Sequence, residues 1–231
     1  MAKIQPLKPF LLLLYGYPGS GKTYFARQFA ETVQAAHLQA DRIRNELFEE
    51  PRYDKQENTI VSQLMNYMNE EFLSAGLSVI YDVNAIKAGQ RKALFDIAHR
   101  YHATPLIIWF QMDADTAFGR NQKRDRRRAD DKYAAQWDRT TFESYIANMQ
   151  NPKPIEDFLV VSGKHVYNMQ QSAVIAKLRT MGVLGSNDAN SKVIKPGMVN
   201  LIPNAPGRVD LSRRNISIRE INKSKNVKYG I

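Results

Sequence analysis

A glycine-rich loop between an apolar run and a helix-compatible stretch carries the clearest chemical signal in the chain. Residues 16–23 read Gly-Tyr-Pro-Gly-Ser-Gly-Lys-Thr, which is the spacing G-x-x-x-x-G-K-T of a Walker A loop. An apolar run at 10–15 precedes this loop and a helical pattern at 24–34 follows it, which is the order the motif needs. The loop therefore predicts a site for the phosphates of a nucleoside triphosphate, with ATP as the expected ligand.

Each residue of the loop is expected to make a different contact with a triphosphate. We expect the ATP-binding residues to be Gly16, Pro18, Gly19, Ser20, Gly21, Lys22 and Thr23. Glycines allow backbone conformations that side chains block, so successive N–H groups can turn inward around a phosphate. The helix that begins near Lys22 adds the positive end of its dipole. Lys22 would contact the β- and γ-phosphates during catalysis, and the Thr23 hydroxyl would bind Mg²⁺.

Composition limits the classes of protein that fit. The chain has 231 residues, of which 43% are hydrophobic, and this is enough for one α/β domain with a substantial core. It has no cysteine, which excludes disulfides and thiolate chemistry, and its four histidines show no metal-ligand spacing. The longest fully apolar run, 10–14, is far shorter than the roughly 20 residues that span a bilayer, and no signal peptide is evident. We therefore expect a cytoplasmic protein without a membrane partner.

The charge of the chain is strongly positive and unevenly distributed. The formal net charge is +10, and residues 186–231 hold nine Lys or Arg against three Asp or Glu. Such an excess is compatible with binding of nucleic acid or another polyanion. It is equally compatible with a solvated tail beside a phosphate-handling site, so both interpretations stay open.

Apolar runs and helical patterns alternate along the chain. The runs that predict strands lie at 10–14, 36–40, 77–81, 105–111 and 158–161. The helical patterns cover 23–34, 42–49, about 55–75, 88–101, 113–128, 139–149 and 170–181. This alternation predicts an α/β protein with a three-layer P-loop NTPase fold, in which helices flank a parallel sheet of about five strands. We expect 1–185 to form this domain, with a lid at about 119–135, and 186–231 to form a basic, loop-rich C-terminal extension.

Polar residues follow the second and third predicted strands, at the sheet edge where such folds bind ligands. Asp41 could accept a proton from a substrate hydroxyl, and Arg44, one helical turn later, could hold an anionic group of the substrate. Asp82 resembles the aspartate of a Walker B strand and could bind magnesium, while Asn84 could hydrogen-bond the substrate. Two simpler interpretations stay open, because Asp41 could only cap the next helix and Asp82 could belong to a loop turn.

Three arginines further along the chain are also candidates. Arg91 opens the helix predicted at 88–101 and could bind substrate, although an exposed surface position is an equally good interpretation. Arg120 and Arg124 are four residues apart and would share one face of the helix predicted at 113–128. In a lid, they would neutralise charge on a transferred phosphoryl group. A basic helix that contacts RNA and a solvated run of charges are the alternatives.

The order of these motifs resembles the P-loop kinase family that includes phage-type polynucleotide 5′-hydroxyl kinase, gluconate kinase, chloramphenicol phosphotransferase and zeta toxins. The resemblance covers about residues 8–182, and Pro152-x-x-x-Glu156 is similar to a segment after the lid. It implies that Lys22 and Thr23 bind ATP and Mg²⁺ and that Asp41 activates the acceptor hydroxyl. It also implies acceptor binding by Arg44, a magnesium network at Asp82, and a lid arginine at Arg120 or Arg124.

These observations predict a kinase that uses ATP and Mg²⁺ to phosphorylate a hydroxyl group. The acceptor stays open, because a polynucleotide 5′-hydroxyl suits the basic segments and a small metabolite suits the rest equally well. The alternative is a nucleotide-dependent regulatory or binding module that hydrolyses ATP slowly. Asp41 and Arg44 discriminate between the two functions, because only a kinase needs a base for an acceptor.

Overall fold

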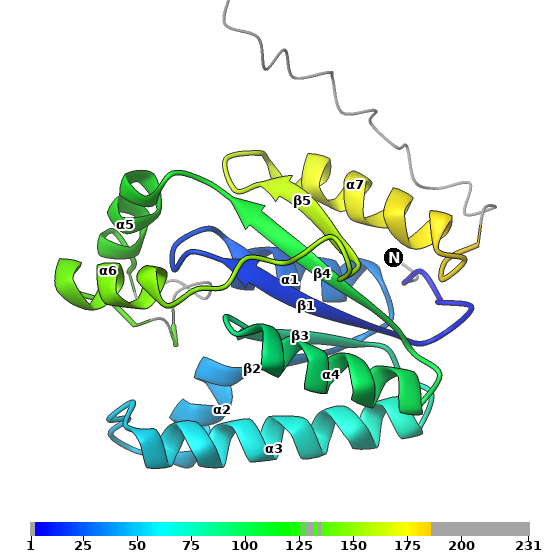
Figure 1. Ribbon diagram of the computed structural model, residues 1–231, viewed down its shortest axis with the longest axis horizontal. Coiled ribbons are helices and arrows are strands. Elements are labelled where there is room, and N and C mark those ends of the chain that lie inside the picture. Colours follow the sequence, from blue (N-terminus) through cyan, green and yellow to red (C-terminus); the bar gives the residue numbers. More distant parts are fainter. Residues whose placement is uncertain (1–2, 126, 128–131, 134, 186–231) are drawn as a thin grey trace, which may run out of the picture. The chain divides into compact units, whose positions relative to one another are not determined.

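The computed structural model of the chain (Figure 1) describes residues 3–125, 127, 132–133 and 135–185. The predicted C-terminal extension at 186–231 and most of the tip of the predicted lid lie outside the described residues. The boundary at residue 185 and the extent of the lid therefore stay predictions.

Five strands form one parallel sheet in the order β2-β3-β1-β4-β5. Their bounds are Phe10–Gly16 for β1, Ala36–Gln39 for β2, Val79–Asn84 for β3, Thr104–Gln111 for β4 and Phe158–Ser162 for β5. All residues of the central strand β1 are buried, because strands flank it and helices cover both faces. The predicted parallel sheet of about five strands is thereby confirmed.

The described residues form seven helices. They are α1 (Lys22–Thr32), α2 (Ala40–Leu47), α3 (Lys55–Ser74), α4 (Ala88–Arg100), α5 (Ala114–Gln122), α6 (Arg139–Ala147) and α7 (Tyr167–Thr180). Helices α1 and α7 cover one face of this sheet, and α3 and α4 cover the other. Successive β1 side chains point to opposite faces, so Leu12 and Leu14 pack with α1 and α7 whereas Leu11 and Leu13 pack with α3 and α4. Figure 1 shows α7 and the α3–α4 pair on opposite sides of the sheet, which gives the predicted three layers. Within the described ranges, no helix has the length and apolar character to cross a membrane.

Strand β3 starts and ends later than the sequence predicts. Leu77 is 40% exposed, and the Ser78 hydroxyl accepts a hydrogen bond from the Phe10 backbone N–H at 3.2 Å, so the strand begins only after these residues. Its last residue, Asn84, pairs with β1 beyond an irregularity in the register. Asp82 consequently lies inside the strand, and the alternative that it belongs to a loop turn is wrong.

Helix α5 ends at Gln122, well before the predicted end at 128. The buried side chain of Asn121 holds the backbone of two later residues, because it donates to the Ala135 carbonyl at 3.2 Å and accepts from the Trp137 N–H at 2.9 Å. Arg124 therefore lies beyond the helix. The prediction that Arg120 and Arg124 share one helix face is wrong.

Arg91 of α4 is fully buried and connects this helix to the segment before β5. Its Nε donates to Glu156 Oε1 at 2.6 Å and its Nη2 donates to Oε2 at 3.0 Å. Its Nη1 donates to the carbonyl oxygens of Ala85 at 3.0 Å and Gln150 at 2.8 Å. The surface position considered for Arg91 is thus wrong, and its contacts support a positioning role rather than contact with a substrate.

The Arg91 ion pair should contribute measurably to stability. Replacing Arg91 with Met leaves the mostly buried Glu156 carboxylate without its partner, so we expect the free energy of unfolding to fall by about 3–5 kcal/mol in urea denaturation. Arg100→Met on the same helix is the matched control, because its 3.4 Å pair with Glu70 is exposed and should contribute less than about 1 kcal/mol. Equal losses in the two variants would contradict the structural role of Arg91.

Candidate functional site

The predicted phosphate loop joins β1 to α1 at the carboxyl edge of the sheet (Figure 1). Gly19 has φ +90°, and a Cβ there would lie 2.1 Å from the Ala117 carbonyl oxygen, so only glycine fits against α5. Gly21 has φ +93° and forms the left-handed N-cap of α1. The Ser20 hydroxyl is buried and has no hydrogen-bond partner among the described residues. A tight loop with a free hydroxyl at a helix N-terminus suits a phosphate group.

Lys22 is held by the backbone of the loop to which it belongs. Its Nζ donates hydrogen bonds to the carbonyl oxygens of Gly16 at 2.8 Å and Tyr17 at 2.9 Å. Burial lowers the pKa of this amine to about 8, and the neighbouring Asp82 carboxylate partly opposes that shift. The ammonium group is therefore desolvated, and an added anion would stabilise its charge.

Asp82 of β3 is buried, and both of its carboxylate oxygens have partners. Oδ1 accepts a hydrogen bond from the Thr23 hydroxyl at 3.3 Å, and Oδ2 lies 3.1 Å from His37 Nε2. Since β3 lies next to β2, it brings Asp82 beside His37. His37 was not among the predicted site residues, because the spacing of the histidines in the sequence does not suit a metal site. The two residues are close because β2 and β3 are neighbours in the sheet, and the order of strands in a sheet cannot be read from the sequence.

The residues around Asp82 fit a magnesium ion that is shared with phosphates. Thr23 and Asp82 supply two oxygen ligands within 3.3 Å of each other. Mg²⁺ commonly takes one or two protein oxygens and completes its coordination with phosphate oxygens and water. Among the residues that the structure describes, no group of three or more His, Cys, Asp or Glu could hold a metal. This donor set suits a magnesium ion that arrives with a nucleotide.

Asp41 lies in the first turn of α2, directly after β2. The N-cap of this helix is Gln39, so the alternative that Asp41 is the cap is wrong. Burial raises the pKa of Asp41 to about 6, and the negative charge of Asp82 raises it further, whereas Arg124 and other nearby cations lower it. Asp41, Asp82 and Lys22 thus share one electrostatic environment at the carboxyl edge.

Arg44 lies one turn after Asp41, as predicted, but its guanidinium group binds α3 and the preceding loop. Nη1 donates to Glu57 Oε2 at 3.1 Å, and Nη2 donates to Asn58 Oδ1 at 2.6 Å. The guanidinium also lies over the Tyr53 ring, 4.6 Å from its centroid. The side chain is buried, so its contacts support anchoring of α2 rather than contact with an acceptor.

The two arginines predicted for the lid have different surroundings. Arg120 Nη1 donates to the Gly163 carbonyl at 2.7 Å, and the residue lines a cavity of about 350 Å³ together with Gly19 and Gly21. Arg124 Nη1 donates to the Ala135 carbonyl at 3.0 Å. The charge of Arg124 also helps to lower the pKa values of Asp41 and Lys22, which connects this arginine with that pair. Asn84 ends β3, and its side chain lies outside the described part of the structure.

The fold is shared with solved P-loop proteins. Kti12 of Chaetomium thermophilum, in complex with ADP-AlF3, is 18% identical with a TM-score of 0.58 over 76% of this chain and 100% of that chain. A gluconokinase from Sinorhizobium meliloti 1021 is 13% identical with a TM-score of 0.55 over 75% and 94%. The Mycobacterium tuberculosis APS kinase CysC, in complex with AMPPNP and APS, is 16% identical with a TM-score of 0.55 over 74% and 98%. At these identities the likeness shows the fold alone.

Comparison of sequences gives the family. No curated protein matches the chain. The family described as AAA domain matches residues 11–152, which is more than half of the sequence and includes the phosphate loop, Asp41 and Asp82. The chain therefore belongs to the AAA domain family.

Proposed function

We propose that the protein is an ATP-dependent kinase that transfers the γ-phosphate to a hydroxyl group of an acceptor. The observation that carries the proposal is Asp41, a half-buried carboxylate with a raised pKa whose charge interacts with Lys22 of the phosphate loop. A nucleotide switch needs no such base, whereas a kinase uses one to accept the hydroxyl proton. The likeness in fold to a gluconokinase and an APS kinase supports the proposal.

The donor nucleotide would bind along the loop at 16–23. Lys22 would exchange the loop carbonyls for the β- and γ-phosphates, while Ser20 and the N-terminus of α1 would donate further hydrogen bonds. Thr23 and Asp82 would hold Mg²⁺, which when bound neutralises phosphate charge. The 350 Å³ cavity beside Gly19 would take the adenosine part of ATP, with Arg120 in its wall.

Phosphoryl transfer would depend on a small group of charged side chains. Asp41 would take the proton from the acceptor hydroxyl while the hydroxyl oxygen attacks the γ-phosphorus. The bond between that phosphorus and the β,γ-bridging oxygen would break, and ADP would leave. Lys22 and Arg124 would stabilise the charge that spreads over the transferred group. With a pKa of about 6, Asp41 is mostly ionised at neutral pH and remains a stronger base than an ordinary aspartate.

The first test separates the base from the donor site. We expect Asp41→Asn to lower acceptor-dependent ADP formation by roughly 10²–10⁴-fold, because it removes the general base, while ATP affinity measured by calorimetry stays within about twofold. Lys22→Ala should impair both properties, and Asp96→Asn on the exposed face of α4 is the matched control. Acceptor-independent ATP turnover that is insensitive to Asp41→Asn would favour a regulatory or binding module instead.

The raised pKa of Asp41 predicts a characteristic pH dependence. Only the ionised carboxylate can accept a proton, so kcat/KM should fall as the pH drops through about 6. An exposed aspartate would move this limb to about pH 4. The measurement is a pH–rate profile at acceptor concentrations below KM, and residual activity of Asp41→Asn should lack the limb. A wild-type profile that stays flat down to pH 5 would count against Asp41.

The lid arginines should differ in their kinetic effects. We expect Arg124→Ala to lower kcat by roughly 10²–10³-fold, because its charge acts at Asp41 and Lys22, with little change in KM for ATP. Arg120→Ala should mainly raise KM for ATP, because Arg120 lines the cavity proposed for adenosine. Steady-state kinetics with varied ATP separates the two variants. The reverse pattern would exchange the two assignments.

A further inference from the structure

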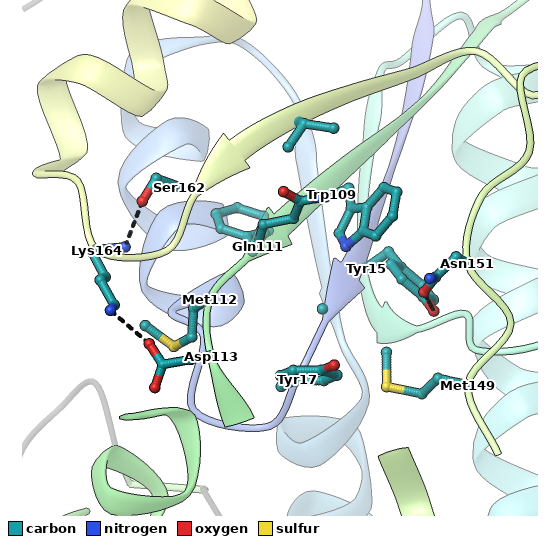
Figure 2. A pocket seen from close by; sticks show the side chains of 13 residues that line it. Tyr15, Tyr17, Trp109, Gln111, Met112, Asp113, Met149, Asn151, Ser162 and Lys164 are labelled. Carbon is teal, nitrogen blue, oxygen red and sulfur yellow. Dashed lines mark hydrogen bonds and ion pairs between the residues drawn. The ribbon is translucent and has the colours of Figure 1, made fainter. Parts of the chain in front are cut away.

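A second and larger cavity, of about 530 Å³, opens beside the phosphate loop (Figure 2). A row of three residues in register on neighbouring strands lines this cavity. Tyr15 of β1 pairs with Trp109 of β4, and Trp109 pairs with Val160 of β5. Residues in register on parallel strands point to the same face of a sheet. Tyr15 is buried and Val160 is 41% exposed, so the row becomes open toward the edge strand β5.

The side chains around this row are suited to a flat ring. Figure 2 shows Tyr17 of the phosphate loop, Met112 after β4 and Met149 after α6 around the cavity. The rings of Tyr15 and Trp109 meet edge to face with their centroids 5.7 Å apart. Aromatic rings and methionine thioethers both make favourable contacts with the faces and edges of aromatic ligands. The lining therefore favours a planar aromatic group.

The charges at the cavity rim cancel each other. Among the residues that the structure describes, Asp113 and Lys164 are the only charged ones in its lining, and the Lys164 ammonium lies 2.6 Å from Asp113 Oδ2 (Figure 2). Within the described lining, a phosphate or carboxylate would find no cation except Lys164, and binding it would require breaking this pair. The lining therefore favours an uncharged ligand, in contrast to the loop at 16–23.

Two side-chain amides in the lining of the cavity can offer uncharged polar contacts. Asn151 Oδ1 accepts a hydrogen bond from the Tyr15 hydroxyl at 2.9 Å, and the Asn151 NH₂ group has no partner among the described residues. The side chain of Gln111 is exposed and likewise has no hydrogen-bond partner within the described part of the chain. Amides offer both donors and acceptors, which match the ring nitrogens and exocyclic groups of a heterocycle.

We propose that this cavity binds an uncharged, planar heterocyclic ring of the acceptor, of nucleobase size; this inference rests on the proposed function. Its position supports the assignment, because Gly16 and Tyr17 line the cavity and their carbonyl oxygens also hold Lys22 Nζ. The volume of about 530 Å³ lies in the range of cavities that bind small molecules. The donor nucleotide would use the other cavity, which is lined by Gly19 and Gly21.

Trp109 allows a direct test by fluorescence. The chain has two tryptophans, so Trp137→Phe, outside the cavity lining, leaves Trp109 as the single reporter. This variant, in the full chain and saturated with a non-hydrolysable ATP analogue, is titrated with adenosine and cytidine, and with ribose as the control without a ring. We expect saturable quenching of Trp109 by at least one nucleoside and none by ribose. Absence of quenching by both nucleosides would overturn the proposal.

Matched variants locate the binding. We expect Val160→Phe, which adds bulk inside the cavity, to raise the dissociation constant at least tenfold, whereas Ile155→Phe at a 93% exposed position outside the lining should leave it unchanged. Equal affinities in the two variants would contradict the site. So would quenching that appears only without the ATP analogue, because the nucleoside would then occupy the donor cavity.

The source of the ring and the proposed function are tested separately. A 5′-hydroxyl oligonucleotide is titrated in parallel, and binding that weakens steeply with added salt would assign the ring to the end of a polynucleotide. Equal, salt-insensitive affinities for nucleoside and oligonucleotide would assign it to a small molecule.

Because fluorescence measures binding alone, nucleoside binding without phosphotransfer would reject the kinase and keep the cavity assignment. Phosphotransfer to a ring-free acceptor without nucleoside binding would reject the cavity assignment and keep the kinase.

Discussion

The buried central strand β1 is the constraint on which the whole site depends. Strands pair with both of its edges and helices cover both of its faces, so its position is fixed. The chain leaves β1 at the carboxyl edge of the sheet. There it turns sharply against α5, where the space at Gly19 excludes any side chain. The neighbouring strand β3 brings Asp82 to Thr23 at the same edge. Packing of apolar side chains thus determines where the charged groups meet.

The arginines of the domain interact with carboxylates in two ways. Arg44 and Arg91 are enclosed and paired with Glu57 and Glu156, so they fix α2 and α4 to the body of the domain. Desolvation and the negative charge of Asp82 raise the pKa of Asp41. The positive charge of Arg124 instead lowers it. This arrangement keeps a carboxylate poised near pH 6 inside a rigid frame. Arginine thus fixes helices at two places of the fold and, in the proposed mechanism, stabilises transferred charge at a third.

Much of the fold could be predicted from the sequence, because apolar runs and the glycine loop are local signals. The five strands and the phosphate loop were predictable in this way. Side-chain partners were not: Arg91 meets Glu156 across 65 positions of sequence, and His37 meets Asp82 only because β2 and β3 are neighbours. The early end of α5 depends on Asn121, whose contacts with Ala135 and Trp137 override the helical pattern. These side-chain partners and the end of α5 depend on burial, strand order and tertiary hydrogen bonds, which are not local properties of the sequence.

We propose that the γ-phosphate of ATP is transferred directly to a hydroxyl oxygen that Asp41 activates. Following ATP by ³¹P nuclear magnetic resonance, with purified protein, Mg²⁺ and separate fractions of RNA, DNA and small hydroxyl compounds, tests it most directly. We expect a new phosphate monoester resonance that grows together with ADP, that requires one of the fractions and that is absent with Asp41→Asn. If the γ-phosphate appeared only as inorganic phosphate in every fraction, and at the same rate in both proteins, direct transfer would be contradicted.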